Sequence, residues 1–517
     1  MMMEGWQIAL IVLASVAAFL FISWQVALWG ATRAYARMIK ENVIEVDDFV
    51  GGPPDPKSAL KCLFYNWFNL HGRKPSTVAL DLRAVDSDKV PGLKVTNRSD
   101  HKNDNINIST QNKPPLVVGT IRMGFGHHRI AYATASWGIP LSETYFHDLL
   151  NIESEEATLI KDTDHLYSKL SRMASEWGGL VEKLWGSLTL SGDADSLRAT
   201  CQMAHHLLPV ISGLDKRSPI IASHCLVAAA AVEAGFQNVI NLVIDNHAQW
   251  FTVVPGALNL VQGPTNYHNF LKMGVPSSQL QLAGHWIPKE LVEGIPTTCQ
   301  WRMDRRNAQK PLRIIIPVGG AGAQRKFVTA LVAELAPLVK ANKIQLFLNA
   351  GDHVHMKKAF EDILEEVELD YNIVPDMESV REFSLKTKTE EPIKNVTLFA
   401  FQDYFTAVAT TDILCEVSDV LAAKPSELAF YPIPKLMIRR VGDHEMYSAL
   451  RASELGDGTL EAREVHDALQ YIELFLNTEL LTSMNTCIIK NNQQGIYDGC
   501  KNAVHIALER AEEMNKN

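Results

Sequence analysis

The first apolar pattern along the chain is a long one, because no charged residue occurs from residue 5 to residue 32. A helix needs about 20 apolar residues to cross the hydrocarbon layer, so this stretch can span a membrane with some tilt. Trp6 lies at one end and Trp24 and Trp29 near the other, as interfacial anchors do. A cleaved signal peptide and a buried core helix are the alternatives. The start Met-Met-Met-Glu and the length of the run favour a retained transmembrane helix over residues 5–32.

Basic residues after the predicted span indicate its orientation. Arg33, Arg37 and Lys40 follow it, whereas only Glu4 precedes it. The cytoplasmic flanks of membrane spans carry an excess of Lys and Arg. We therefore expect a single-pass membrane protein whose soluble part lies in the cytoplasm.

Beyond residue 114, short β-branched runs alternate with stretches rich in Ala, Leu and Glu, which is typical of βαβ units around a buried parallel sheet. A polar basic stretch at 298–311 interrupts the alternation, which then restarts. The pattern predicts strands at 116–121, 219–222, 239–245, 258–262, 312–318, 343–349, 396–401, 412–415, 419–422 and 434–438.

This alternation predicts an α/β fold with two Rossmann-like domains that face a cleft, where α/β proteins place ligands. We assign residues 115–300 to the first domain and residues 311–517 to the second. Residues 33–114 are expected to form a membrane-proximal region and an Asn-rich polar linker.

Each half opens with a strand that runs into glycines. Gly124 and Gly126 follow the first strand, and Gly319, Gly320 and Gly322 follow the strand that opens the second half. Glycine lets the backbone approach a ligand, and the helix that follows offers unpaired N–H groups and the positive end of its dipole. Both turns suit an anion, although a short glycine pattern alone also fits any βα turn.

Composition narrows the classes of partner. The net charge of −10 argues against nucleic acid, whose phosphates are bound by basic surfaces. The seven cysteines are scattered and odd in number, which indicates reduced thiols. Because no zinc-type spacing of Cys and His occurs, we expect no metal site.

Several motifs recur in a familiar order and spacing. They are Gly126-His127 with Ala131 and Ala133, then Pro219 to Cys225, Val243 to Trp250, Leu258 to Thr265, Gly274 to Gly284, Gly319 to Arg325, Ser418 to Pro434, and Gly442 to Ala449. Together they resemble the GT-B glycosyltransferases, and within them the family 28-like group that makes bacterial lipid II and plant monogalactosyldiacylglycerol. The resemblance covers about two thirds of the chain.

The resemblance implies a donor site for a nucleotide sugar in the second half. Glu427 would hold the ribose, because one carboxylate supplies two acceptors for a diol. Glycine-turn N–H groups can neutralise the departing diphosphate without a metal. The expected donor-site residues are Gly319, Gly320, Gly322, Arg325, Lys424, Ser426, Glu427, His444 and Glu445.

The same resemblance places a general base in the first half. The acceptor hydroxyl loses a proton as it attacks the anomeric carbon, and a neutral imidazole can take that proton near pH 7. His127 is the first choice by its position in the motif, and His128 is the alternative. Asp245 could assist catalysis or bind the acceptor, and His247 and His224 also stand at strand ends.

One departure from the family pattern concerns the loop before Glu427. Family members carry a Gly-rich turn with Thr or Ser there, whereas Lys424-Pro-Ser follows the predicted strand almost directly. Either Lys424 and Ser426 replace some phosphate contacts, or the strand is really Asp412-Ile-Leu and the loop is longer.

These patterns lead to one function and two rivals. The leading hypothesis is a membrane-anchored glycosyltransferase that moves a hexose from a nucleotide sugar, UDP-linked by resemblance, to a lipid or lipid-linked acceptor, without a metal or other cofactor. The rivals are a catalytically silent GT-B domain that serves as a membrane-tethered binding or scaffold subunit, and a nucleotide-sugar epimerase.

Overall fold

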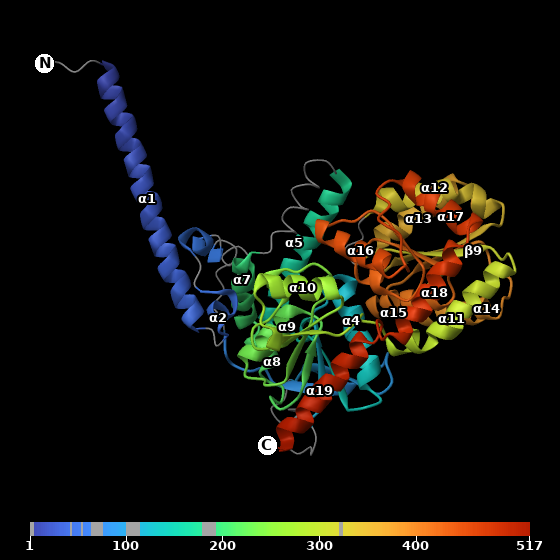
Figure 1. Cartoon of the computed structure of the whole chain (residues 1–517), viewed down its shortest axis with the longest axis horizontal. Coiled ribbons are helices and arrows are strands. Elements are labelled where there is room, and N and C mark those ends of the chain that lie inside the picture. Colours follow the sequence, from blue (N-terminus) through green and yellow to red (C-terminus); the bar gives the residue numbers. More distant parts are fainter. Residues whose placement is uncertain are drawn as a thin grey trace.

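The computed structural model describes residues 5–41, 44–52, 55–60, 62–63, 76–99, 114–177, 193–319 and 324–516. These residues form two α/β domains, each built on one sheet, and a long N-terminal helix (Figure 1). The predicted fold class is therefore confirmed, including the apolar helix that precedes the two domains.

The sheet of the first domain has the strand order β1-β2-β4-β3-β5-β6-β7-β8. All neighbours are parallel except β1 and β2, which are antiparallel. The strands are β1 (Leu82–Asp86), β2 (Leu93–Arg98), β3 (Leu116–Thr120), β4 (Thr144–Asp148), β5 (Ile220–Ala222), β6 (Val239–Leu242), β7 (Leu258–Val261) and β8 (Leu280–Leu282).

Helices cover both faces of this sheet, because neighbouring residues of its strands enter different apolar clusters. Ile220 packs with α7 and α9, whereas Ile221 packs with α4, α11 and α19. The elements connected to the first sheet are α2 (Val46–Val50), α4 (Gly124–Gly138), η2 (Leu149–Asn151), α5 (Glu155–Trp177), α7 (Ala194–His205), α8 (Leu208–Ile211), α9 (Cys225–Glu233), η3 (Trp250–Thr252), α10 (Pro264–Met273) and η4 (Ser277–Gln279).

The sheet of the second domain is parallel throughout, with the order β11-β12-β10-β9-β13-β14. The inner strand β9 is buried at every position, as its run Leu-Arg-Ile-Ile-Ile-Pro predicts. The strands are β9 (Leu312–Pro317), β10 (Ile344–Gly351), β11 (Asn372–Val374), β12 (Val396–Ala400), β13 (Val420–Ala423) and β14 (Lys435–Met437).

Two groups of helices cover the second sheet. Ile314 and Ile316 face α12, α13, α17 and α18, whereas Ile315 faces α14 and α15. The elements are α12 (Arg325–Lys340), α13 (Val354–Glu366), α14 (Met377–Lys388), α15 (Tyr404–Glu416), η5 (Glu427–Phe430), η6 (Asp443–Glu445), α16 (Met446–Glu454), α17 (Val465–Asn477) and α18 (Leu480–Gln493).

Helices α11 (Lys289–Asn307) and α19 (Gly499–Lys516) tie the two domains together. One apolar cluster contains side chains of both sheets and of α4, α11, α15 and α19. The end of the chain returns to the first domain, where α19 packs along α4 (Figure 1). There Asn238 Nδ2 donates to the Ala507 carbonyl at 2.8 Å, and Asn502 Nδ2 donates to the Ala283 carbonyl at 2.8 Å.

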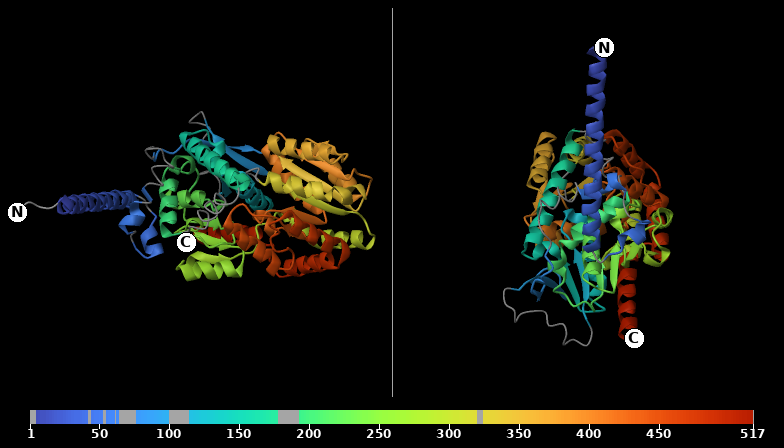
Figure 2. Two further views of the ribbon diagram at one scale, coloured as in Figure 1. Left: turned by 90° about the horizontal axis from the view of Figure 1, so that it is seen from above. Right: turned by 90° about the vertical axis from the view of Figure 1, so that its left-hand side faces the viewer.

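The N-terminal helix α1 (Gly5–Glu41) projects away from the first domain, on the side opposite the second domain (Figures 1 and 2). Its segment Val12–Gly30 is long and apolar enough to cross a membrane. The side chains of Phe19 and Phe21 are 69% and 63% exposed, so the two domains do not cover them.

The structure differs from the predicted strands in two ways. Residues 412–415, predicted as a strand, lie inside α15, because Tyr404–Glu416 is one continuous helix capped by Asp403. The first sheet also contains strands that the sequence analysis did not identify, and β1 and β2 come from residues 33–114, which were expected to form a membrane-proximal region and linker. The pattern of β1, Leu-Arg-Ala-Val-Asp, has only its first residue buried, so its apolar signal is weak.

A buried ion pair supports the far edge of the second sheet. Lys435 Nζ lies 2.7 Å from Asp457 Oδ1, and both side chains are fully buried. The Tyr497 hydroxyl donates to Asp457 Oδ2 at 2.6 Å, and Lys435 also donates to the Tyr431 carbonyl at 2.7 Å. Because a buried charge is costly without its partner, this pair holds the segment before α19 against β14.

We expect Lys435→Met to lower the free energy of unfolding by about 3–5 kcal/mol, because it leaves the Asp457 carboxylate buried and unpaired. Lys394→Met is the matched control, since Lys394 pairs with the exposed Asp370 and an exposed pair contributes at most about 1 kcal/mol. Denaturant unfolding of the full chain, followed by tryptophan fluorescence, measures both. Equal effects of the two substitutions would contradict a structural role for the buried pair.

Candidate functional site

The turn that joins β3 to α4 meets Glu427 of the second domain, and we call this junction between the domains the cleft. Gly124, the first residue of α4, has φ +71°, a conformation that favours glycine. A Cβ on Gly126 would lie 3.1 Å from Glu427 Oε2 and 3.5 Å from Ile244 Cδ1. The glycine at 126 therefore permits the close approach of a carboxylate from the second domain.

Glu427 reaches this turn from η5. Its carboxylate oxygen Oε1 lies 3.6 Å from Arg129 Nε, and its side chain is 13% exposed. The same guanidinium forms an ion pair with Asp412 at 2.8 Å and donates to the Val408 carbonyl at 3.0 Å. Arg129 thus joins α4 to two elements of the second domain, α15 and η5, and positions the carboxylate that was predicted to hold a ribose.

His127 is half-buried beside Gly126, with its ring oriented by the backbone. Nδ1 lies 2.6 Å from the Ser223 carbonyl oxygen, which can only accept a hydrogen bond. The proton therefore belongs on Nδ1, and Nε2 retains the lone pair that a base needs.

Burial lowers the pKa of His127 below its ordinary value, because the imidazolium loses hydration. The hydrogen bond to the Ser223 carbonyl and the charges of Asp245 and Glu427 act in the opposite direction. His127 is consequently neutral at pH 7. The two carboxylates that act on it come from different domains.

The neighbouring histidines have other tasks. His224 packs on His127 with ring centroids 4.3 Å apart, and its Nδ1 accepts from the Leu226 N–H at 3.2 Å, which caps α9. Burial, and then repulsion from His127, lowers the pKa of His224 well below its ordinary value. His128, the alternative base, is buried with Nε2 at 3.2 Å from Asp148 Oδ2, so it faces β4 and not Glu427.

Asp245 and His247 lie in the loop after β6. The Asp245 backbone carbonyl accepts from Asn266 Nδ2 at 2.9 Å, and its side chain is half-buried. His247 stacks on Tyr447 of the second domain with centroids 4.4 Å apart. Burial, and then the proximity of His444, lowers the pKa of His247. The loop therefore contributes a carboxylate near His127 and a second junction between the domains.

The predicted phosphate cradle is described only at its edges. Gly319 follows β9, and a Cβ there would lie 3.1 Å from Lys424 Cε. Gly320 and Gly322 lie outside the described residues. Arg325 is exposed and begins α12. His353, which the sequence analysis did not single out, has Nε2 3.1 Å from the Gly319 carbonyl oxygen and so lies beside this turn.

The predicted sugar-contacting loop meets Lys424. Glu445 forms an ion pair with Lys424, and its Oε2 accepts from the Val441 N–H at 2.8 Å. Although burial opposes ionisation, the charges of Lys424 and His444 lower the pKa of Glu445. Lys424 follows β13 directly, so the alternative of a longer loop after a strand at Asp412 is wrong.

The segment after Lys424 is shorter than a donor-binding helix. Ser426 precedes the four-residue turn η5, and its side chain makes no capping hydrogen bond there. The structure thus brings His127, Asp245 and Glu427 around Gly126, and places Lys424 and Glu445 beside Gly319. Their roles stay predictions.

Arg129, Tyr404 and His353 also contribute to the cleft and were missed. The Tyr404 hydroxyl donates to the Gly124 carbonyl, and the Phe125 ring packs 5.5 Å from the His353 ring. A local signal for Arg129 existed, since a cation inside the apolar helix that follows the first glycine turn needs a buried partner.

Two family models match consecutive parts of the chain. Residues 73–272 match a Domain of unknown function (DUF6937), and residues 275–508 match a Domain of unknown function (DUF6938). No curated protein matches the sequence.

Several solved structures are similar to the chain. The co-structure of MnaA from S. aureus with UDP is 9% identical, with a TM-score of 0.42 over 75% of this chain and 94% of that one. UDP-GlcNAc 2-epimerase from Neisseria meningitidis bound to UDP-GlcNAc is 12% identical, with a TM-score of 0.40 over 78% and 100%. HepE from Anabaena in complex with UDP and glucose is 11% identical, with a TM-score of 0.37 over 78% and 100%.

The two carboxylates beside His127 generate a test of the site. We expect Asp245→Asn and Glu427→Gln each to lower the pKa of His127 further, because each removes a negative charge that stabilises the imidazolium. Diethyl pyrocarbonate modifies only the neutral imidazole, so the pH profile of His127 modification, read by peptide mass spectrometry, should move to lower pH. The exposed His466 of α17 serves as the internal control. An unmoved profile would place both carboxylates too far from His127.

Proposed function

We propose that the chain is a membrane-anchored glycosyltransferase that transfers a hexose from a nucleotide sugar to a lipid or lipid-linked acceptor. The observation that carries the proposal is the proximity of His127 from the first domain and Glu427 from the second at Gly126. A base and a candidate ribose ligand from opposite domains suit a reaction that joins two substrates in the cleft.

The chemistry of transfer needs one proton acceptor. The acceptor hydroxyl attacks the anomeric carbon, the new carbon–oxygen bond forms, and the bond from that carbon to the diphosphate oxygen breaks. The hydroxyl proton passes to Nε2 of His127, and the nucleoside diphosphate leaves with the bonding electrons. His127 suits this role because Nδ1 is held by Ser223 and its pKa lies below its ordinary value.

The donor would be bound by the second domain. Glu427 offers two carboxylate oxygens to the ribose diol, and Arg129 holds the carboxylate in place. The diphosphate would lie over the turn after β9, near Lys424 and Arg325, where the start of α12 contributes its positive dipole end. The choice of a UDP-linked sugar, and of a route without a metal, follows from the resemblance in the sequence.

The acceptor is proposed to be a lipid because of α1. Its exposed Phe, Leu and Trp side chains are costly in water and would be buried by a bilayer. Basic residues after the span favour a cytoplasmic position for the two domains.

An epimerase acting on a nucleotide sugar is the second candidate, favoured by the proximity of Asp245 to His127. Two acid–base groups at one place could remove a proton from a sugar carbon and return it. Such an enzyme would convert the nucleotide sugar with no acceptor present, so incubations without lipid separate the two functions. The ion pair of Lys424 with Glu445 favours a catalytically silent binding subunit as a further candidate. Such a subunit would bind the nucleotide without converting any nucleotide sugar.

We expect His127→Gln to reduce sugar transfer by about 10²–10⁴-fold, because general-base assistance is worth that much. UDP affinity should stay unchanged, since His127 is not assigned to the donor. Transfer is measured as UDP release from a panel of UDP-sugars with membrane lipid extract, and affinity by calorimetry. His466→Gln on the exposed face of α17 is the matched control. Undiminished transfer by His127→Gln would remove the proposed base.

We expect Glu427→Gln to weaken UDP binding about 10-fold or more, because hydrogen bonds to a charged group contribute about 1.5–3 kcal/mol each. The amide keeps the shape of the side chain but offers one acceptor to the diol instead of two. Calorimetric titration with UDP measures the loss, and Glu416→Gln on α15, where Glu416 pairs with the exposed Lys388, controls for the loss of a surface charge. Retention of full UDP affinity would exclude the ribose role.

A further inference from the structure

A second hollow lies at the amino ends of the strands of the second sheet, whereas the cleft lies at their carboxyl ends. It is a cavity of about 420 Å³ among the end of α11, the start of β9, the turn before β10 and the turn between α17 and α18. Leu312 begins β9 at this cavity, and Gly319 follows the same strand in the cleft. At about 3.3 Å per residue, the six residues of β9 separate the two places by roughly 20 Å.

The walls of this cavity are cationic in a chain of net charge −10. Among the described residues that line it, five carry a positive charge and two a negative one. The cations are Arg302, Arg305, Arg306, Lys310 and Lys343, and the carboxylates are Asp419 and Glu479. Most of the cations come from the polar basic stretch at 298–311, to which the proposed function assigns no role.

Backbone carbonyls hold two of these arginines. Arg302 donates to the carbonyls of Ser418 at 2.9 Å and Cys415 at 2.7 Å. Arg306 donates to the carbonyl of Phe475 at 2.7 Å and to that of Thr478, and it also pairs with the exposed Glu479 at 3.8 Å. Carbonyl oxygens fix the guanidinium plane of Arg302 without cancelling its charge, so Arg302 contributes positive potential to the cavity.

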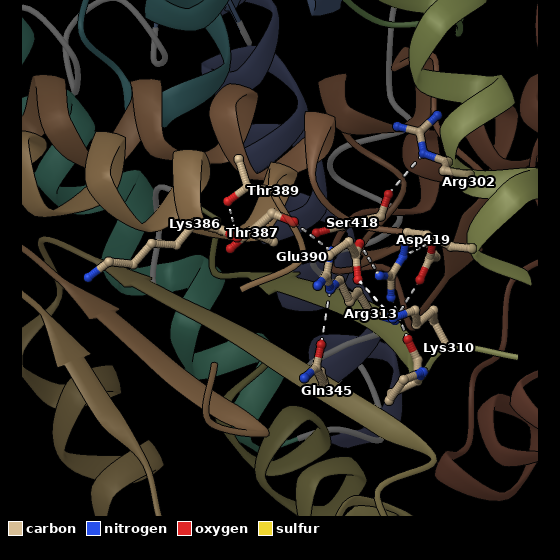
Figure 3. Close-up of polar contacts among 12 residues, drawn as sticks. Arg302, Lys310, Arg313, Gln345, Lys386, Thr387, Thr389, Glu390, Ser418 and Asp419 are labelled. Atoms are coloured by element: carbon tan, nitrogen blue, oxygen red, sulfur yellow. Dashed lines mark hydrogen bonds and ion pairs between the residues drawn. The ribbon is translucent and has the colours of Figure 1, made fainter. Parts of the chain in front are cut away.

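The third arginine, Arg305, belongs to a network that also contains Arg313. Figure 3 shows Arg313, Glu390 and Asp419 of this network. Arg305 pairs with Glu390 at 2.6 Å and Asp419 at 3.4 Å, and Arg313 pairs with the same Glu390 at 3.3 Å. Burial, and then repulsion from Arg305, lowers the pKa of Arg313 to about 10. These two arginines are matched by the two carboxylates, so the excess positive charge of the wall comes from Arg302, Lys310 and Lys343.

The open side of the cavity offers mobile donors. Lys310 and Lys343 are exposed, and Lys310 Nζ lies 3.9 Å from Glu390. Thr482 lines the cavity from the first turn of α18, where the helix dipole favours an anion. Fixed guanidinium groups with flexible lysines at the mouth suit the oxygens of a phosphoryl group.

We propose that this cavity is a second binding site, which takes a small soluble anion carrying one or two phosphoryl groups. Its position at the amino ends of the strands separates it from the donor cleft, so its ligand is an effector and not a substrate. A soluble ligand is favoured over a lipid headgroup because α1 extends from the opposite side of the molecule (Figures 1 and 2). The proposal does not depend on the proposed function.

The test is calorimetric titration of the detergent-solubilised full chain with inorganic pyrophosphate. We expect binding by the unaltered protein and at least a tenfold loss of affinity in Lys310→Ala/Lys343→Ala. Both lysines are exposed, so the thermal midpoint should not move and folding is preserved. The matched control, Lys357→Ala/Lys358→Ala, removes two other exposed charges of the same domain and should bind as the unaltered protein does.

Lys424→Ala distinguishes this cavity from the donor cleft. Loss of pyrophosphate binding in Lys424→Ala alone would place the anion in the cleft and overturn the proposal. Equal weakening by the two double variants would show only a general effect of surface charge, and no binding by the unaltered protein would overturn the proposal directly. UDP titration of Lys310→Ala/Lys343→Ala tests the donor site separately, since UDP affinity should stay unchanged there.

Discussion

The ion pairs of Arg129 hold the two halves of the cleft in one geometry. Its guanidinium is 3% exposed, and a charge so deeply buried is stable only with its partners in place. Those partners, Asp412 on α15 and Glu427 on η5, belong to the second domain, whereas Arg129 stands on α4 of the first. The Tyr431 hydroxyl, which donates to Asp412 at 2.8 Å, completes the arrangement.

The position of the candidate base follows from the same contact. His127 lies half a turn before Arg129 on α4, so the ion pairs that position Arg129 also set the distance from His127 to Glu427. The glycine at 126 favours this arrangement because a Cβ there would lie only 3.1 Å from the Glu427 carboxylate and would displace it by a few tenths of an ångström. The ion pair between Arg129 and Glu427 and the glycine at 126 thus depend on each other, because both concern the position of the Glu427 carboxylate.

The apolar cluster shared by both domains gives this contact its support. It joins Ile221 and Ile240 of the first sheet with Ile315 and Phe347 of the second through α4, α11, α15 and α19. A continuous core of this kind resists relative motion of the domains more than a polar interface does. The two ends of the second sheet differ in charge. The cleft at the carboxyl ends of its strands contains carboxylates, and the cavity at their amino ends is cationic.

The sequence was sufficient for the elements whose signal is local. Buried parallel strands such as β3 and β9 are continuous apolar runs, the glycine turns directly follow them, and the uncharged stretch at residues 5–32 is a helix. The signal failed where burial is one-sided or the element is short, as in β1 and β8, and where an apolar run belongs to a helix, as at residues 412–415.

The candidate site could be predicted only in part, for a physical reason. The glycines stand out because they directly follow strands, and the carboxyl ends of parallel strands meet at one edge of a sheet. His127 and Glu427 were selected by their positions in the motifs that resemble the glycosyltransferase family. The pairing of Arg129 with Asp412 depends instead on how the two sheets face each other. The pairing of Lys424 with Glu445, and the contact of His353 with Gly319, depend on which strands of the second sheet lie side by side. Local sequence carries no record of that relative placement, because it arises from packing between residues far apart along the chain.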